Sequence, residues 1–238
     1  MATEIETLGR WIAESDNIVF FGGAGVSTES GIPDFRSVDG LYNQKWAYPP
    51  ETILSHSFFE RDPEEFYRFY REKLVVRGAK PNQAHLRLAQ LEQEGKLKAV
   101  LTQNIDGLHQ AAGSRQVLEL HGSTLRCYCA RCGRRYPAAY INEGTGVPRC
   151  DCGGIVRPDV VLYEEPLDQD ILQKSVMYIR QADMLIIGGT SLAVYPAAGL
   201  INYYRGNRLV LVNRGATPRD GEADLIVRGN IGQVFSQV

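Results

Sequence analysis

Short apolar runs alternate with amphipathic stretches along most of the chain. The runs expected to form strands, rich in β-branched and aliphatic residues, are 17–21, 98–102, 117–120, 184–187, 209–212 and 224–227. Apolar residues at three- and four-residue spacing predict helices over 3–14, 63–71, 82–94 and 167–179, and a short helix after the last strand. Alternation of this kind is typical of a parallel sheet, so the pattern predicts an α/β fold.

Polar or glycine-rich clusters follow several of these strands. They lie at 22–37, 103–109, 188–191 and 213–215, and His121 with Gly122 follows the run at 117–120. The carboxyl ends of parallel strands share one edge of a sheet, where open α/β folds bind their ligands. The sequence therefore predicts a Rossmann-like open parallel sheet with a ligand lying across that edge.

The cluster after the first strand, Gly22 to Ser37, indicates a nucleotide cradle. Gly23 and Gly25 allow a pyrophosphate to approach the backbone, and 27–29 (Ser-Thr-Glu) are expected to cap a following helix. The dinucleotide fingerprint is incomplete, because Thr28 stands where a third glycine belongs and no strand-borne acid follows about twenty residues later. A tight strand-to-helix turn explains the glycines equally well. Beyond the turn, Phe35 can cover a flat ring and Arg36 can pair with phosphate.

Composition narrows the class of protein. The 238 residues are 44% hydrophobic with a formal net charge of −2, which gives no electrostatic case for general nucleic-acid binding. No apolar run approaches eighteen residues, and the first residues are acidic and polar. We expect a cytoplasmic monomer that neither enters a membrane nor reads a nucleic-acid sequence.

The five cysteines cluster between 127 and 152, which indicates metal binding. Cys129 and Cys132 form a C-x-x-C-G knuckle, and Cys150 with Cys152 forms a shorter C-x-C-G knuckle. Four thiolates at such spacing suit a closed, structural Zn²⁺ site, with Cys127 as the alternative to Cys129. Ordinary buried cysteines and a nucleic-acid zinc ribbon are the other interpretations, although the segment carries few cations for the latter.

These modules suggest a division of the chain. Residues 1–37, 80–122 and 155–238 are expected to form the Rossmann-like NAD-binding domain. A helical insertion, 38–79, and the zinc module, 123–154, are expected to form a small domain.

His121 is the strongest candidate for a base, because it follows a strand and precedes a glycine. His85 on a helix and His56 in an irregular stretch are better explained as structural, and His109 is left open. Tyr followed by Lys four residues later, the usual short-chain dehydrogenase pattern, does not occur. Besides hydride transfer, a bound NAD can react by cleavage at the nicotinamide ribose. For that reaction Asp106 can hold the carboxamide, Phe35 can cover the ring and His121 can act as the base.

Motifs from 22 to about 231 resemble, in order and spacing, those of bacterial sirtuins, the NAD-dependent protein lysine deacylases. They are GAGVSTESGIPDFR, TQNIDGLH, HG at 121, the cysteine knuckles, RPDVV, GGTSLAVYPA and LVN. Two departures are the shortened second knuckle and Tyr163-Glu164-Glu165, where sirtuins often have Phe-Gly-Glu.

The resemblance implies an NAD-dependent lysine deacetylase that moves acetyl from lysine to ADP-ribose and releases nicotinamide, with His121 and Asn104 catalytic. The implied NAD-binding residues are Gly23, Ala24, Gly25, Thr28, Asp34, Phe35, Arg36, Gln103, Asn104, Ile105, Asp106, His121, Gly189, Thr190, Ser191, Asn213 and Ile231. The acyl-lysine peptide is expected to add as a strand beside Val160, Val161, Leu162 and Tyr163, opposite Val194. Mono-ADP-ribosyl transfer and an NAD-sensing zinc-ribbon module are the alternative functions.

Overall fold

The computed structural model of the chain describes residues 2–34, 40 and 46–238. Its larger part is a parallel sheet with the strand order β3-β2-β1-β7-β8-β9. These strands are β1 (Ile18–Gly22), β2 (Leu97–Thr102), β3 (Val117–Glu119), β7 (Met184–Gly188), β8 (Leu209–Asn213) and β9 (Leu225–Arg228). Counted along the chain the order is 3-2-1-4-5-6, that of the Rossmann fold. The expected open parallel sheet is confirmed.

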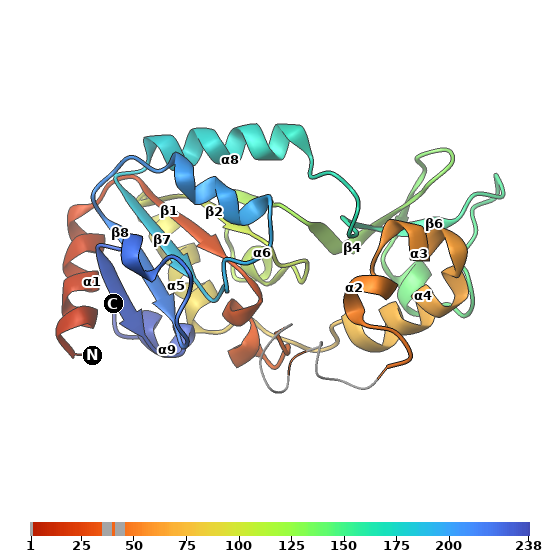
Figure 1. Ribbon diagram of the computed structural model, residues 1–238, viewed down its shortest axis with the longest axis horizontal. Helices are drawn as coiled ribbons and strands as arrows, with labels where there is room; N and C mark the ends of the chain where they lie inside the picture. The colour runs from red at the N-terminus through yellow and green to blue at the C-terminus, as the bar shows by residue number, and fades with distance from the viewer. Residues whose placement is uncertain (1, 35–39, 41–45) are drawn as a thin grey trace.

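Helices cover both faces of this sheet because its central strands are apolar on both sides. In β1, Ile18 and Phe20 pack into one core, and Val19 and Phe21 pack into the other. The first core lies under α1 (Ala2–Glu14), α5 (Gln83–Gln93) and α9 (Ile231–Phe235), and the second lies under α8 (Gln169–Gln181) and the 3-10 helix η5 (Ala197–Tyr203). Figure 1 shows α8 along one side of the sheet and α1, α5 and α9 on the other.

A smaller lobe is built around an antiparallel sheet and a third core. Its strands, in the order β5-β4-β6, are β4 (Gly122–Cys129), β5 (Arg135–Pro137) and β6 (Val156–Val160). Its helices are α2 (Pro50–Ile53), α3 (His56–Arg61), α4 (Pro63–Phe69), the π-helical turn η4 (Tyr70–Leu74) and α7 (Ala139–Asn142). Aromatic residues of α3 and α4, such as Phe58 and Phe66, share this core with Cys127 and Cys129. Figure 1 shows these helices beside β4 and β6.

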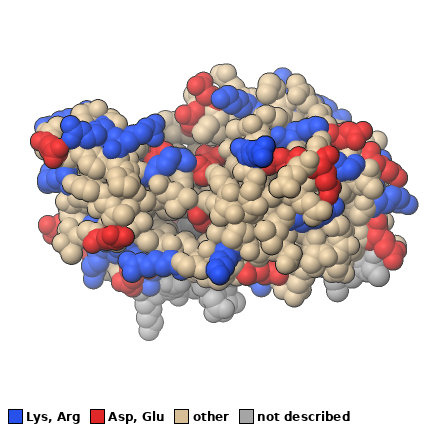
Figure 2. Space-filling view, turned by 180° about the vertical axis from the view of Figure 1, so that it is seen from behind, with Lys and Arg blue, Asp and Glu red and all other residues tan. Residues whose placement is uncertain are grey.

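The expected division of the chain into two domains stays a prediction. It assigned 155–238 to the Rossmann-like part, whereas β6 pairs with β4 in the small sheet and Val156 belongs to the third core. In Figure 2, which views the molecule from behind, a hollow separates the smaller lobe from the larger one. Positive and negative side chains are interspersed over the larger lobe on this face.

Several expected helix boundaries follow from local chemistry. Asp62 caps α4 by accepting a hydrogen bond from the Glu65 N–H at 3.1 Å, and Pro63 occupies the first helical position. The short helices α2 and α3 were not predicted, because the stretch from 38 to 63 lacks a helical repeat. Within the described ranges, no helix is long and apolar enough to cross a lipid bilayer.

The prediction of a helix after the nucleotide cradle is wrong. Two 3-10 turns, η1 (Ala24–Val26) and η2 (Thr28–Ser30), stand in its place. The Ser27 side chain caps neither turn, because its hydroxyl donates instead to the Asp106 carboxylate. The Ser27 hydroxyl, which local sequence assigned to a helix cap, thus makes a hydrogen bond to a distant part of the chain instead.

Candidate functional site

A cavity of about 660 Å³ lies at the carboxyl edge of the large sheet and reaches the smaller lobe. Its walls include the segments that follow β1, β2 and β7 and the end of β8. The strand order reverses between β1 and β7, which is where open α/β sheets leave a crevice for a ligand. The edge of the sheet predicted to bind a ligand therefore borders a cavity that is large enough for a large organic molecule.

Most of the predicted site residues line this cavity. Of the residues predicted to bind NAD, those that line it are Ala24, Gly25, Thr28, Asp34, Gln103, Asn104, Ile105, Asp106, His121, Gly189, Thr190, Ser191, Asn213 and Ile231. The expected peptide edge, Val160, Val161, Leu162 and Tyr163 with Val194, lines it too. Gly23 is not among the lining residues, and Phe35 and Arg36 lie outside the described residues.

The glycines of the cradle are required mainly by the packing of two loops. A Cβ at Gly25 would lie 2.8 Å from the Gly189 carbonyl oxygen, and the Gly25 N–H donates to that oxygen at 2.7 Å. A Cβ at Gly23 would lie 2.8 Å from the Thr190 Cβ. The loops after β1 and β7 thus approach more closely than side chains permit, which brings their backbones to one end of the cavity.

A hydrogen-bonded cluster joins the loops after β1 and β2. The Ser27 hydroxyl donates to Asp106 Oδ2 at 2.6 Å and accepts from Asn104 Nδ2 at 3.1 Å. Asp106 Oδ1 also accepts the Leu108 N–H at 2.9 Å. Ser27 and Asn104 are buried, so the cluster fixes the Asn104 amide and the Asp106 carboxylate at the cavity wall. No sequence pattern indicated this role of Ser27, because only the fold brings residue 27 to residues 104 and 106.

His121 reaches the cavity from the end of β3. Its Nδ1 lies 3.0 Å from the Gln103 carbonyl oxygen. A carbonyl only accepts, so Nδ1 carries the proton and Nε2 keeps its lone pair. Burial lowers the pKa of His121 below 6.5, and the Gln103 carbonyl offsets part of that shift. The imidazole is therefore neutral at pH 7 and oriented as a base.

The residues toward β7 and β8 suit the sugar and phosphate groups of a nucleotide. Gln103 Nε2 is buried without a hydrogen-bond partner in the part of the chain that the structure describes, while its Oε1 lies 3.4 Å from the Thr190 hydroxyl. A buried amide without a partner is a place for a ligand acceptor such as a ribose hydroxyl. Asn213 Nδ2 donates to the Thr190 carbonyl at 3.2 Å, which holds its carboxamide at the cavity. The close loops and the unsatisfied amide fit NAD.

The smaller lobe supplies cavity residues that the sequence did not indicate. They are Leu54, Lys73, Leu74 and Val76, and on the other side Arg214, Gly215, Ala216, Gly229 and Asn230 also line it. No motif marks the first group, because the packing of the lobes alone brings α2 and η4 to the cavity.

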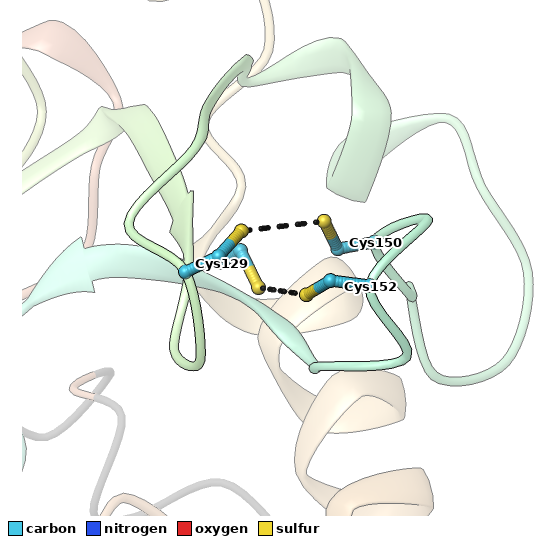
Figure 3. Close-up of side chains that lie close together, drawn as sticks. Cys129, Cys150 and Cys152 are labelled. Atoms are coloured by element: carbon cyan, nitrogen blue, oxygen red, sulfur yellow. Dashed lines mark hydrogen bonds between the residues drawn. The ribbon is translucent and has the colours of Figure 1, made fainter.

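The four predicted metal ligands lie together in the smaller lobe (Figure 3). Their sulfur atoms all lie within 4.8 Å of one another, with 3.4 Å between Cys129 and Cys152 and 3.7 Å between Cys132 and Cys150. A tetrahedral Zn²⁺ with Zn–S bonds of about 2.3 Å requires sulfurs about 3.8 Å apart, so this set fits the ion. Cys127 is outside the set, since its Sγ faces the carbonyls of Tyr136 and Pro137 at 3.2 and 3.3 Å. The cluster contains Cys129 and not Cys127, which agrees with the predicted set, and the C-x-C knuckle reaches the same cluster.

The other histidines do not line the cavity. His85 and His109 are buried with ring centroids 4.7 Å apart, and burial lowers their pKa values to about 4 and about 3. His56 begins α3 and pairs with Glu165 at 2.8 Å. The expected structural roles of His56 and His85 agree with these contacts, and His109 belongs with them.

The Sir2 family model matches residues 23–196. An NAD-dependent protein deacetylase of Clostridium acetobutylicum is 59% identical over 239 residues, which cover 99% of this chain and 98% of that protein. One of Clostridium perfringens is 60% identical over 242 residues and covers 100% and 99%.

Solved Sir2 structures share the fold. A structure described as the complex of Sir2 with a p53 peptide and NAD+ has a TM-score of 0.88 at 42% identity and covers 98% of this chain and 96% of its own. A structure described as Sir2 with a deacetylated p53 peptide and 3′-O-acetyl ADP-ribose has a TM-score of 0.91 at 40% identity, with coverage of 98% and 96%. The chain therefore belongs to the Sir2 family.

Proposed function

We propose that this protein is an NAD-dependent protein lysine deacetylase that transfers acetyl from lysine to ADP-ribose and releases nicotinamide. The observation that carries the proposal is the neutral, oriented imidazole of His121 in one cavity with the Asn104–Ser27–Asp106 cluster. Its relatives from two Clostridium species are named for this activity.

The base is His121. NAD, when bound, supplies the bond between nicotinamide and ribose that breaks in the reaction. His121 Nε2 takes a proton from a ribose hydroxyl, and its Nδ1–H stays on the Gln103 carbonyl, which stabilises the resulting imidazolium. That hydroxyl then attacks the acyl carbon, whose oxygen has replaced nicotinamide on the ribose, and the lysine amine leaves as water completes the transfer.

Asn104 and Asp106 form the nicotinamide end of the cavity. Asp106 accepts a hydrogen bond from the carboxamide N–H, while Ser27 and the Leu108 N–H hold the carboxylate still. Asn104, fixed by Ser27, orients the reacting ribose. Because these groups are positioned before the ligand binds, little of the binding free energy is needed to order them.

The rest of the nucleotide lies toward β7 and β8. Gly189, Thr190 and Ser191 face the phosphates, Gln103 meets the ribose beside nicotinamide, and Asn213 meets the adenosine ribose. The support is their place on the cavity wall and the unpaired Gln103 Nε2. Phe35 and Arg36 complete the set as predictions from sequence.

Acyl-lysine proteins are the proposed substrates. The peptide adds as a strand beside Val160–Tyr163 and opposite Val194, both of which border the cavity. We place the enzyme in the cytoplasm, because free cysteines that bind Zn²⁺ are typical of a reducing compartment. The monomeric state stays a prediction from sequence.

Incubation with NAD and an acetyl-lysine peptide tests the function. Equal amounts of nicotinamide and free lysine peptide are expected, with formation of free lysine peptide lowered by about 10²–10⁴-fold in the His121→Ala variant and no reaction with an unacetylated peptide. ADP-ribose attached to protein would instead indicate a mono-ADP-ribosyltransferase. Binding of NAD without turnover would indicate an NAD-sensing module.

A further inference from the structure

Glu164 has a backbone conformation that side chains disfavour. Its φ is 75°, in the left-handed region where a Cβ crowds the backbone. Glycine adopts this conformation freely, and the related motif often has glycine here. A glutamate that keeps such a conformation beside a cavity needs a compensating contact, and a backbone outlier of this kind is a reason to look for function.

The compensating contact is with α3 of the smaller lobe. Glu164 Oε2 accepts the Ser57 N–H at 2.9 Å, and Oε1 accepts the Ser57 hydroxyl at 3.0 Å. Both carboxylate oxygens are therefore used on one residue of α3. Glycine at position 164 has no atoms that can make this contact.

The backbone just before Glu164 is bonded to the start of the same helix. Tyr163 N–H donates to the Leu54 carbonyl at 3.0 Å, and the His56 N–H donates to the Tyr163 carbonyl at 3.0 Å. These bonds form an isolated parallel bridge between Ser55 and Tyr163. The segment after β6 thus continues as a short strand against the start of α3.

The carboxylate of the next residue, Glu165, holds the turn through several hydrogen bonds. It accepts two hydrogen bonds from the buried Arg157 guanidinium, at 2.6 and 2.9 Å, and one from the Leu162 N–H at 2.8 Å. His56 Nδ1 lies 2.8 Å from the same carboxylate. Arg157 also donates to the Val160 carbonyl at 3.0 Å, so this pair holds the turn from both sides.

We propose that Glu164 is a positioning residue that fastens the peptide-binding edge, residues 160–163, to α3 and so sets that edge before substrate binds. The proposal rests on the proposed function of that edge. Glu165 and Arg157 hold the turn itself, and Glu164 adds a side-chain link from the turn to Ser57 of α3, beside the backbone bonds of Tyr163. An edge strand that is already ordered loses less conformational freedom when a peptide pairs with it.

The effect on binding separates positioning from a simple contribution to stability. Glu164→Gly removes the contact with Ser57 and also relieves the left-handed conformation, so thermal stability is expected to stay the same or to rise. The KM for acetyl peptide is expected to rise about 3- to 10-fold, which is the range that one ordinary hydrogen bond contributes. The kcat and the KM for NAD are expected to stay within about twofold, since neither Glu164 nor Ser57 belongs to the proposed catalytic cluster.

Partner and control variants complete the test. Ser57→Ala is expected to raise the peptide KM in the same direction, and the double variant Glu164→Gly with Ser57→Ala should be no worse than Glu164→Gly alone. Glu164→Gln keeps one acceptor and should recover part of the affinity. Glu51→Gln, which removes an exposed carboxylate from α2, should change nothing.

Hydrogen exchange gives a readout that requires no turnover. The amides of Leu162 and Tyr163 are expected to exchange at least several-fold faster in full-length Glu164→Gly than in the wild type. Unchanged exchange together with unchanged peptide KM would overturn the positioning role, even in an active deacetylase. An inactive wild type would refute the proposed function, while faster exchange in Glu164→Gly would still show that Glu164 fastens the segment.

Discussion

The zinc site gives the sharpest test of the structure, because two buried cysteines of the same strand are predicted to behave differently. Cys129 belongs to the sulfur cluster, whereas Cys127 faces two backbone carbonyls. Both residues are at most 2% exposed and belong to the third core. Serine at either position removes one sulfur atom from similar surroundings, so the two variants are matched.

The expected magnitudes differ widely. A structural Zn²⁺ contributes about 10–16 kcal/mol in small zinc modules, which is comparable to the about 5–15 kcal/mol that stabilises a whole domain. Cys129→Ser is therefore expected to lose the ion and unfold the smaller lobe, including the β4–β6 sheet. Cys127→Ser is expected to lose only about 1 kcal/mol of packing, or about 2–4 °C in Tm for a chain of this length.

Metal analysis and thermal unfolding of both full-length variants provide the measurement. One Zn²⁺ per chain is expected in the wild type and in Cys127→Ser, and none in Cys129→Ser. A chelator should unfold the wild type in the same way as the Cys129 substitution does. A soluble, zinc-free Cys127→Ser protein would refute the assignment, and so would a Cys129→Ser protein that retained its metal and stability.

Five further predictions follow from the site and the buried histidines. His121→Ala is expected to lower deacetylation by about 10²–10⁴-fold while the fold is kept, and a folded variant with more than a tenth of wild-type turnover would contradict the base assignment. Because burial lowers the pKa of His121, the acid limb of the wild-type kcat/KM profile should lie below pH 6.5. Asp106→Asn should weaken nicotinamide inhibition more than ADP-ribose binding, measured by inhibition and titration calorimetry; equal losses would count against the carboxamide contact. Acetyl-lysine should be preferred over succinyl-lysine in kcat/KM. The Arg71 guanidinium donates to the Ile141 and Gly146 carbonyls and does not line the cavity, so it is not placed to pair with the succinyl carboxylate. An equal succinyl rate that disappears in Lys73→Met would assign the succinyl carboxylate to Lys73 and reject this prediction. Burial, and to a lesser extent His85, lowers the pKa of His109 to about 3, so below pH 6.5 the unfolded chain binds a proton that the folded chain does not. From this residue the free energy of unfolding should therefore fall by up to about 1.4 kcal/mol for each pH unit below 6.5. Urea unfolding of His109→Phe at pH 7, 6 and 5 should show a shallower slope of stability against pH than the wild type, and an unchanged slope would exclude His109 as the cause.

The sequence alone determined the class of fold and most of the chemistry. Apolar runs such as 184–187 form strands buried on both faces, which only a covered parallel sheet accommodates. The paired Cys-Gly knuckles identified four ligands because metal geometry restricts their spacing. The position of His121 after a strand predicted its place at the cavity, since strand ends meet at the ligand edge.

Tertiary structure decided which partner each polar group has. Local sequence assigned Ser27 to a helix cap, but a carboxylate 79 residues away in the chain took its hydroxyl. Glu164 was visible only as a departure from a motif, and its left-handed backbone and its contact with Ser57 emerged when the fold brought α3 beside the segment after β6. The periodic pattern of apolar residues predicts which side chains of one segment are buried. A hydrogen bond between distant segments depends instead on where the folded chain places both groups.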